Sequence, residues 1–471
     1  MYEDEGMPDV LSSRRWVRWV AALVILALLG GSSYYINGLL QGADPSRRDL
    51  EDVSPSDRPA NAFACGGTTP VDPIPDDATG TEQLREITAR VETLRELMRK
   101  KPITSEYLTG EQLLAEVRKL NEEGYSPSEI DRDERILRTL GLIESDDELS
   151  EILDALAGQV AGFYDPRDGR LVVGSERGAS VEPAAELTLA HEIQHALADQ
   201  SFELPIEEEP DGPDLDRALA QRSLVEGDAT LLQQHYATAL LTAQEAGEIL
   251  DDPATRKAMR DLADISYPIR RSFEFPYSYG LAFVCDLYSS GGWAAVDAAY
   301  RSPPTTTAQV LFPHRYAIEE TAQVAPELAS PDAGWELREE ASVGAADLLV
   351  MFEAPGGNPA SKLNDPLGAA AAWAGGFMWS WSKGPDDLIG ISLVQRRGDY
   401  DLCASMHAWY LKAFPDGGSQ PRRGNEALVY EGRDRAGVLA CTQSWVAMAI
   451  APDVETARSI LETRGVVAAN W

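Results

Sequence analysis

The sequence predicts an α+β protein built from one transmembrane helix, a mostly helical central domain with a small β-hairpin or sheet, and a small α+β module at the C-terminal end. Three observations support this prediction. Residues 19–40 form a segment without charged side chains. Residues 82–325 carry mainly the three- and four-residue apolar spacing of amphipathic helices. Residues 338–471 mix strand-like runs with helical patterns. The same boundaries predict a short tail at 1–18 and a linker at 41–81.

The composition limits the classes of partner. The chain has 471 residues, 44% of them hydrophobic, which is ample for buried cores. Its formal net charge of -36 at pH 7 argues against nucleic acid or an anionic membrane surface as a partner, because like charges repel. We therefore expect no nucleic-acid binding, and the oligomeric state remains open.

The segment at 19–40 predicts a membrane anchor. Its 22 residues are just long enough to cross a bilayer core at about 1.5 Å per residue. Arg14, Arg15 and Arg18 precede it, so the positive-inside rule keeps residues 1–18 in the cytoplasm and places the rest of the chain outside. We expect a single-pass protein of the cell membrane with an extracytoplasmic main part. The alternative is secretion after signal cleavage, but no clear A-x-A site follows the apolar run.

Residues 41–81 predict a disordered linker, because a stretch rich in Asp, Pro, Ser and Gly buries too little apolar surface to fold. Cys65 lies within it and is interpreted as a loop cysteine. An oxidising compartment would permit one disulfide between Cys403 and Cys441. That pairing would leave Cys65 and Cys285 as odd thiols, although four cysteines allow three connectivities.

Helical patterns open the central domain, at residues 81–100, 110–123, 126–142 and 146–158. Two β-rich runs around a D-P-R-D-G turn follow at residues 159–174 and predict a hairpin. In the C-terminal module, strands are predicted at 377–382, 387–394, 426–432, 437–443 and 445–452, and helices at 400–414 and 454–462. This module contains no metal-ligand spacing, no G-x-S-x-G and no Gly-rich phosphate loop, so we expect it to support the fold or to recognise substrate.

The helical run at 187–200 carries the pattern H-E-x-x-H. Residues four apart lie on one face of a helix, so His191 and His195 can hold one metal ion together. Glu192, beside the first histidine, can take a proton from a water on that metal. The chain has only five histidines, and chance placement of two of them around a Glu in this spacing is expected on the order of once in a few hundred such sequences. The pattern therefore predicts a zinc site with hydrolytic chemistry.

A third ligand is available in the next helical run. Residues 214–244 contain no proline and one internal glycine, Gly227, which directly follows Glu226. A glycine inside a helix costs about 1 kcal/mol relative to alanine, so its presence predicts close contact with another backbone. We expect that backbone to belong to the helix at 187–200.

H-E-x-x-H followed by E-G-x-A resembles the gluzincin metallopeptidases. The resemblance implies a zincin-like catalytic domain in which His191, His195 and Glu226 bind zinc and Glu192 is the general base. Thermolysin-like members have an aspartate four residues after the ligand glutamate that orients a ligand histidine. Here that position is Thr230, which leaves the support of the ligands unassigned.

The nearest acid, Asp228, is two residues after the predicted ligand and faces elsewhere on an ideal helix. It is the next candidate ligand if Glu226 does not bind metal. Beyond the zinc motifs, the segments HALADQSF, LVEGDAT and FPYSYGLAFV are similar to a group of exported prokaryotic proteins classed as peptidases, most without an assigned substrate. This similarity spans roughly residues 83–320.

Members of the resembling family use a Tyr or His to donate a hydrogen bond to the developing oxyanion. The candidates here are Tyr277, Tyr279, His235 and His314, and sequence distance does not rank them. Aromatic side chains at such spacing are more often part of a core.

The hairpin is a candidate for substrate binding. In metallopeptidases of this type, a strand edge near the zinc binds extended peptide through backbone hydrogen bonds. Residues near Ala161 to Tyr164 or Leu171 to Gly174 are therefore candidates for lining the cleft. The alternative is an ordinary hairpin over the core.

The sequence thus predicts a membrane-anchored zinc metallopeptidase that hydrolyses peptide or protein substrates outside the cytoplasm by metal-activated water. Removal of residues from a peptide end would need a group that fixes a free terminus, and no motif for one is present. The non-enzyme alternative is a catalytically retired surface or assembly protein on a peptidase scaffold. The intact H-E-x-x-H together with Glu226 argues against it.

Overall fold

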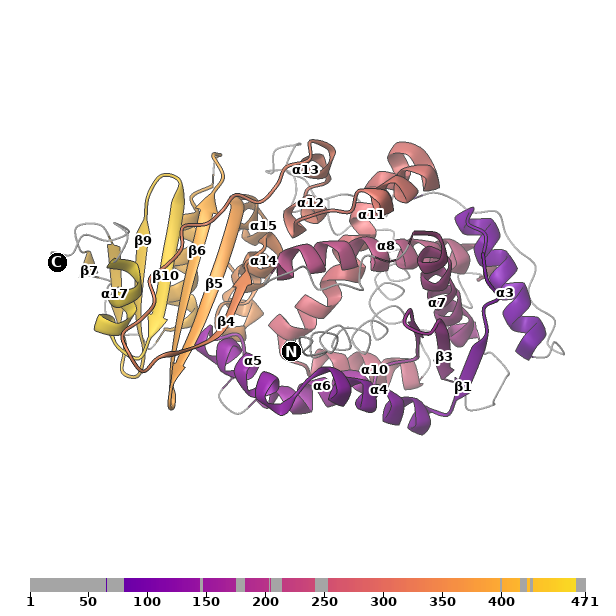
Figure 1. Cartoon of the computed structure of the whole chain (residues 1–471), viewed down its shortest axis with the longest axis horizontal. Coiled ribbons are helices and arrows are strands. Elements are labelled where there is room, and N and C mark those ends of the chain that lie inside the picture. The colour runs from indigo at the N-terminus through magenta and orange to yellow at the C-terminus, as the bar shows by residue number, and fades with distance from the viewer. Residues whose placement is uncertain are drawn as a thin grey trace, which may run out of the picture.

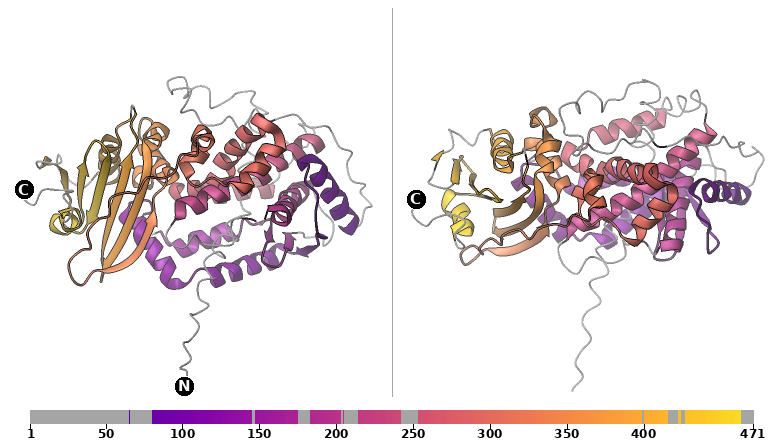
Figure 2. Two further views of the ribbon diagram at one scale, coloured as in Figure 1. Left: turned by 45° about the horizontal axis from the view of Figure 1, so that its top comes forward. Right: turned by 90° about the horizontal axis from the view of Figure 1, so that it is seen from above.

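The computed structural model describes residues 65, 80–144, 147–174, 183–202, 204, 214–241, 253–398, 400–415, 422–423 and 427–462. Over these ranges the protein is α+β, as the sequence predicts. A helical part with a three-stranded sheet lies beside a seven-stranded sheet that forms the C-terminal end (Figures 1 and 2). Among the described helices, none is both long and apolar enough to cross a membrane. The predicted anchor at 19–40 and the tail at 1–18 lie outside the described residues.

The helical patterns at the start of the central domain form α3 (Gly80–Arg95), α4 (Gly110–Gly124), α5 (Pro127–Thr139) and α6 (Leu149–Ala157). α4 begins with a capping box, in which the Thr109 side chain accepts from the Gln112 N–H and the Gln112 side chain accepts from the Thr109 N–H. α3 ends earlier than the apolar pattern predicts. The reason is Glu96, whose φ of 58° is left-handed and cannot continue a right-handed helix.

The predicted hairpin is present as β2 (Gly162–Asp165) and β3 (Arg170–Gly174), which pair antiparallel. Gly169 closes the turn with a φ of +71°, a conformation that favours glycine. A third strand, β1 (Ser105–Leu108), was not predicted and pairs parallel with β3. The order of the sheet is therefore β1-β3-β2, with β2 at one edge.

Three long helices carry the candidate site. They are α7 (Pro183–Phe202), α8 (Leu215–Leu240) and α11 (Tyr267–Arg301), and α10 (Pro253–Ala263) precedes the last of them. The Asp214 side chain caps α8 by accepting from the Arg217 N–H. α11 is kinked at Gly291 and Gly292, where the φ of +65° at Gly292 interrupts the helix. Both halves contact α8, the first through Gly280 and the second through the Tyr300 hydroxyl, which donates to Asp228.

Gly227 of α8 lies against Gly280 of α11. A Cβ on Gly227 would be 2.2 Å from the carbonyl oxygen of Gly280, and a Cβ on Gly280 would be 2.2 Å from the carbonyl oxygen of Ser223. The prediction that Gly227 marks a close backbone contact is confirmed, but the expected partner was wrong. α7 packs on α8 through longer side chains, such as Gln233, which donates to the Leu187 carbonyl of α7. Only the contact with α11 requires glycine.

The C-terminal sheet is antiparallel, in the order β4-β5-β6-β10-β9-β8-β7. Its strands are β4 (Glu336–Ser342), β5 (Trp373–Lys383), β6 (Asp386–Gln395), β7 (Arg422–Arg423), β8 (Ala427–Glu431), β9 (Ala436–Cys441) and β10 (Trp445–Ala451). The remaining helices are α12 (Thr307–Leu311), α13 (Pro313–Ala317), α14 (Ala345–Glu353), α15 (Pro366–Ala371), α16 (Leu402–Ala413) and α17 (Val454–Glu462). Every predicted strand and helix of this module is present, and the strands β4 and β7 and the helices α14 and α15 are additional.

The C-terminal sheet shares a hydrophobic core with the helical part. One buried cluster contains Phe283 of α11, Leu349 of α14 and Trp409 of α16 together with residues of β6 and β10. α14 and α15 lie between the sheet and α8 (Figure 1). The buried Arg315 of α13 adds a polar connection, because it donates to the carbonyl of Trp373 at 3.1 Å. The sheet thus supports the helices that carry the site.

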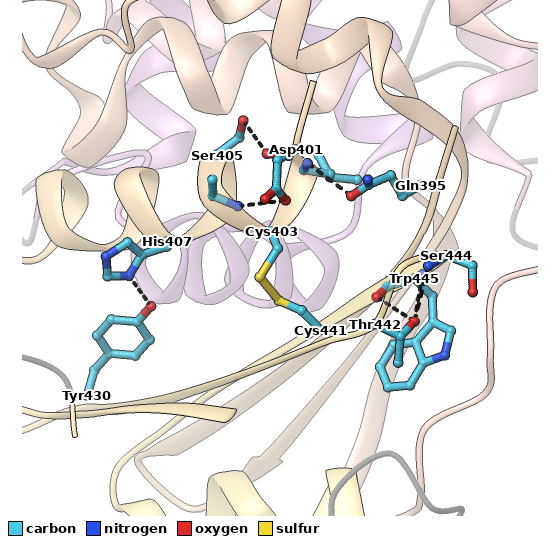
Figure 3. The surroundings of a disulfide bond; sticks show 12 residues. Gln395, Asp401, Cys403, Ser405, His407, Tyr430, Cys441, Thr442, Ser444 and Trp445 are labelled. Carbon is cyan, nitrogen blue, oxygen red and sulfur yellow. Dashed lines mark hydrogen bonds between the residues drawn. A yellow bond between two sulfur atoms is a disulfide. The ribbon is translucent and has the colours of Figure 1, made fainter. Parts of the chain in front are cut away.

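Two disulfides are formed. Cys403 of α16 pairs with Cys441 of β9, as the sequence suggested (Figure 3). Cys65 pairs with Cys285 of α11, which corrects the expectation that these two would be odd thiols. The backbone of Cys65 also interacts with His235 of α8. Sequence reasoning missed this pairing because 220 residues separate the two cysteines, so that only the folded structure brings them together.

Candidate metal centre

The three predicted ligands lie together between α7 and α8. The Nε2 atoms of His191 and His195 are 3.0 Å apart. Both face Oε2 of Glu226, at 3.3 Å from His191 and 3.5 Å from His195. Ligand atoms that surround a zinc ion tetrahedrally at about 2.0–2.1 Å lie about 3.3 Å from one another. The three separations therefore fit one metal ion, and within the described ranges this is the one such group of His, Cys, Asp or Glu side chains.

The surroundings of Glu226 also fit a cation. Its side chain is fully buried, and its Oε2 faces the two imidazoles at 3.3 and 3.5 Å. A buried carboxylate is costly unless positive charge compensates it. Two imidazole nitrogens and one carboxylate oxygen form a ligand set that zinc prefers and that leaves a fourth position open.

The group is strongly coupled electrostatically. Burial lowers the pKa of His191. Burial also acts to lower the pKa of His195, but the Glu226 carboxylate outweighs it and raises this pKa to about 9. At Glu226 burial favours the neutral acid, yet the two histidines outweigh burial and lower its pKa to about 2. Without a metal, the pair of His195 and Glu226 is therefore charged at neutral pH.

Glu192 lies beside this group but outside it. Its side chain is 1% exposed, and its carboxylate faces the backbone of Tyr164 on β2, although neither oxygen has a hydrogen bond of full geometry. Burial raises the pKa of Glu192 to about 7, although the charge of His195 opposes this shift. A carboxyl group that titrates near neutral pH can both accept and return a proton. The structure thus leaves Glu192 available for proton transfer.

Of the four candidate hydrogen-bond donors, the structure brings Tyr277 to the metal centre. Its ring stacks on that of His191, with centroids 6.3 Å apart and an interplanar angle of 26°. Its buried hydroxyl lies near the Glu226 carboxylate but outside hydrogen-bond geometry. Burial raises the pKa of Tyr277 well above 10, and the charges of Glu226 and Glu192 add to this effect. Tyr277 is therefore protonated and can donate.

The other three candidates have different neighbours. The Tyr279 hydroxyl accepts from Arg271 at 3.0 Å, in a cluster that connects α11 to α14. His235 packs edge-on against Trp293, with centroids 5.5 Å apart. His314 lies on the short helix α13.

Arg222 is a site residue that sequence reasoning missed. It lies one turn before Glu226 on α8 and is 6% exposed. Burial lowers the pKa of Arg222 to about 10, and Glu226 and Tyr277 are the neighbours that oppose this shift. A spacing of four residues places it on the same helix face as Glu226, and that spacing was the available signal. It brings a positive charge next to the metal centre.

The strand pairing in the three-stranded sheet distinguishes the two strands that were candidates for binding substrate. β3 pairs with β1 on one side and with β2 on the other, so both of its edges are used. β2 pairs only with β3 among the described strands. Of the two predicted segments, only the one ending at Tyr164 therefore has an edge that no described strand pairs with, although all four residues of β2 are buried. The Tyr164 hydroxyl donates to Asp199 of α7 at 2.7 Å, which fixes β2 beside the metal-binding helix.

Asp228 does not join the ligands. It accepts hydrogen bonds from Arg95, Gln194 and Tyr300, on the side of α8 away from Glu226, as predicted. The hydroxyl of Thr230 is buried and has no hydrogen-bond partner among the described residues.

Comparisons of the chain with protein-family models, with curated proteins and with solved structures find no match. The geometry and chemistry of the metal centre are therefore the basis for inferring a function.

Proposed function

We propose that the protein is a zinc-dependent metallopeptidase. The observation that carries the proposal is the approach of His191, His195 and Glu226 to within 3.0–3.5 Å of one another, with the buried Glu192 beside them. A cluster that served the fold alone would gain little from a second buried carboxyl group whose polar contacts do not offset its burial. A hydrolase needs such a group next to its metal.

Each residue of the site has a separate role in the proposed reaction. A zinc ion held by His191, His195 and Glu226 would act as a Lewis acid and make a water nucleophilic at neutral pH. Glu192 takes the proton of the attacking water and passes it to the leaving amine. The Tyr277 hydroxyl donates a hydrogen bond to the carbonyl oxygen as negative charge develops there.

Arg222 and β2 complete the proposed site. The guanidinium of Arg222 adds positive charge next to Tyr277, where the negative charge of the reaction develops. The edge of β2 that no described strand pairs with can bind an extended peptide through backbone hydrogen bonds, which recognise any sequence. These features favour a protein or peptide substrate that binds in an extended conformation.

We further propose that the enzyme works outside the cytoplasm, anchored by residues 19–40. The disulfides support this location, because all four cysteines of the chain are paired and disulfides are rare in cytosolic proteins. Secretion after signal cleavage would be equally consistent with the disulfides, and it is the alternative to anchoring.

The test of the metal centre is metal analysis of the purified full-length chain. We expect one zinc per chain, and we expect His191→Ala to remove most of it because two ligands hold zinc far more weakly than three. His314→Ala is the matched control, since it removes an imidazole outside the centre. Full zinc occupancy in His191→Ala would refute the site. A wild-type chain that binds zinc but cleaves no peptide from a diverse library would favour the retired scaffold.

A further inference from the structure

A buried polar network is built around Asp228, two residues after Glu226 on α8. Asp228 accepts from Arg95 of α3 at 2.8 Å, from the Gln194 amide of α7 at 2.7 Å and from the Tyr300 hydroxyl of α11 at 2.9 Å. We call these four residues the Asp228 network. All four side chains are buried, and Arg95 and Asp228 are fully so. Four helices that are distant in sequence are thus joined at one carboxylate.

Stability alone does not account for this network. Removing a charged pair from water costs about as much as the pair regains, and apolar packing of the same volume is often at least as stable. Arg95 nevertheless enters a fully buried position, where it also pairs with Asp297 at 2.8 Å and lies 4.4 Å from the ring centroid of Trp293. Directional bonds of this kind fix an arrangement of helices that apolar contacts leave less defined.

The network and the metal centre share the same two helices. Gln194 directly precedes His195 on α7, and Asp228 follows Glu226 by two residues on α8. Residues two apart on a helix point in nearly opposite directions, about 200° apart. The metal centre therefore lies on one side of the contact between α7 and α8, and the bond between Gln194 and Asp228 lies on the other.

The positions of the helices matter here because ring contacts, and not a hydrogen bond at Nδ1, hold the imidazole of His191. Metal-binding histidines usually donate their second ring nitrogen to a carboxylate or carbonyl group, which fixes the ring. Nδ1 of His191 is buried without a hydrogen-bond partner among the described residues. The orientation of its ring therefore depends on the roll of α7 about its own axis.

We propose that Asp228 is a positioning residue of the metal centre. By holding Gln194, and being held itself by Arg95, it fixes the roll of α7 against α8 and so sets the separation of the two imidazoles from Glu226. The inference rests on the proposed function only through the metal site and does not depend on peptide cleavage.

The test uses Gln194→Met in the full-length chain, because this change removes the bond to Asp228 but keeps the volume and the pair of Arg95 and Asp228. Gln233→Met is the matched control. Gln233 is also buried on α8 and bonds to α7, through the carbonyl of Leu187, but two turns away from Glu226. Both variants lose one buried hydrogen bond between the same two helices.

We expect Gln194→Met to weaken zinc binding about 10- to 100-fold in competition with a chromophoric chelator, the range typical of lost outer-shell contacts. We also expect its visible spectrum with Co²⁺ to differ from that of the wild type. Gln233→Met should keep the zinc affinity and the Co²⁺ spectrum of the wild type. In the absence of metal, the two variants should have similar melting temperatures.

Wild-type zinc affinity and Co²⁺ spectrum in Gln194→Met would overturn the proposal, as would an equal loss in both variants, which would indicate helix packing in general. A wild-type chain that binds neither metal would overturn the metal centre and the positioning role together. A wild type that binds zinc without cleaving peptides would contradict only the peptidase function, and the comparison of the two variants would still decide the role of Asp228.

Discussion

The backbone of Gly227 lies so close to Gly280 that a Cβ on Gly227 would be 2.2 Å from the Gly280 carbonyl oxygen. This crossing of α8 and α11 has a direct consequence for the metal centre. Glu226 directly precedes Gly227, and Tyr277 lies one turn before Gly280. The contact between two glycines thus brings a hydrogen-bond donor of α11 to a ligand carried by α8.

Gly227→Ala should therefore damage both the fold and the site. The added methyl group has to separate two backbones, and such overpacking typically costs about 1–3 kcal/mol in the free energy of unfolding. Denaturant unfolding measures this cost. Gly398→Ala is the control, because its Cβ would meet nothing within 4 Å. Equal stability of the two variants would contradict the close contact.

Tyr277→Phe should lower kcat about 10²- to 10³-fold, the usual effect of losing one donor to a developing oxyanion. Zinc content and KM should change little, since the hydroxyl bonds to the substrate oxygen mainly in the transition state. Steady-state kinetics on a cleavable peptide measures kcat and KM for both proteins. Tyr279→Phe, whose hydroxyl contacts Arg271 of the same helix, should retain wild-type kcat. If both variants were equally active, Tyr277 would have no role in the reaction.

Zinc binding should release close to one proton per ion at pH 7. Burial lowers the pKa of His195, but the charge of Glu226 outweighs burial and raises it to about 9, so this imidazole is protonated at pH 7. Zinc requires the neutral imidazole and therefore displaces the proton. Zinc affinity should consequently increase with pH up to about 9 and level off above that value, because no proton is then left to displace.

Isothermal titration calorimetry in buffers of different ionisation enthalpy counts the released protons. The titration needs a chain freed of metal beforehand. Zinc binding without net proton release between about pH 6 and 8 would contradict the charged state assigned to His195.

The sequence predicts the part of the metal centre that depends only on the spacing of residues within one helix. His191 and His195 are four residues apart on one helix, so their spacing alone places them on one face. The strands of the C-terminal module were likewise predictable, because each has an alternating or continuous apolar pattern within its own residues. Glu226 could also be predicted as a ligand, since its helix pattern and the following Gly227 are visible in the sequence.

The remaining features depend on contacts between distant segments. The choice of Tyr277 over Tyr279 follows from the crossing at Gly280, and nothing local to α11 distinguishes the two side chains. β1 was missed because a single short strand shows little periodicity, and its partner β3 lies more than 60 residues away. The role of Asp228 depends on Arg95, which belongs to a helix whose charges look like an ordinary solvated face in the sequence.

The measurement that tests the central claim most directly is the comparison of Glu192→Gln with the wild-type chain. Glu192 lies outside the ligand group, and the amide oxygen of a glutamine can still accept from the backbone of Tyr164, so the change should preserve zinc content and melting temperature. Peptide cleavage should fall about 10²- to 10⁴-fold, because the amide cannot accept the proton of the attacking water. Cleavage at the wild-type rate by a zinc-loaded Glu192→Gln chain would contradict the proposed mechanism, and loss of zinc from this variant would show that Glu192 binds the metal instead.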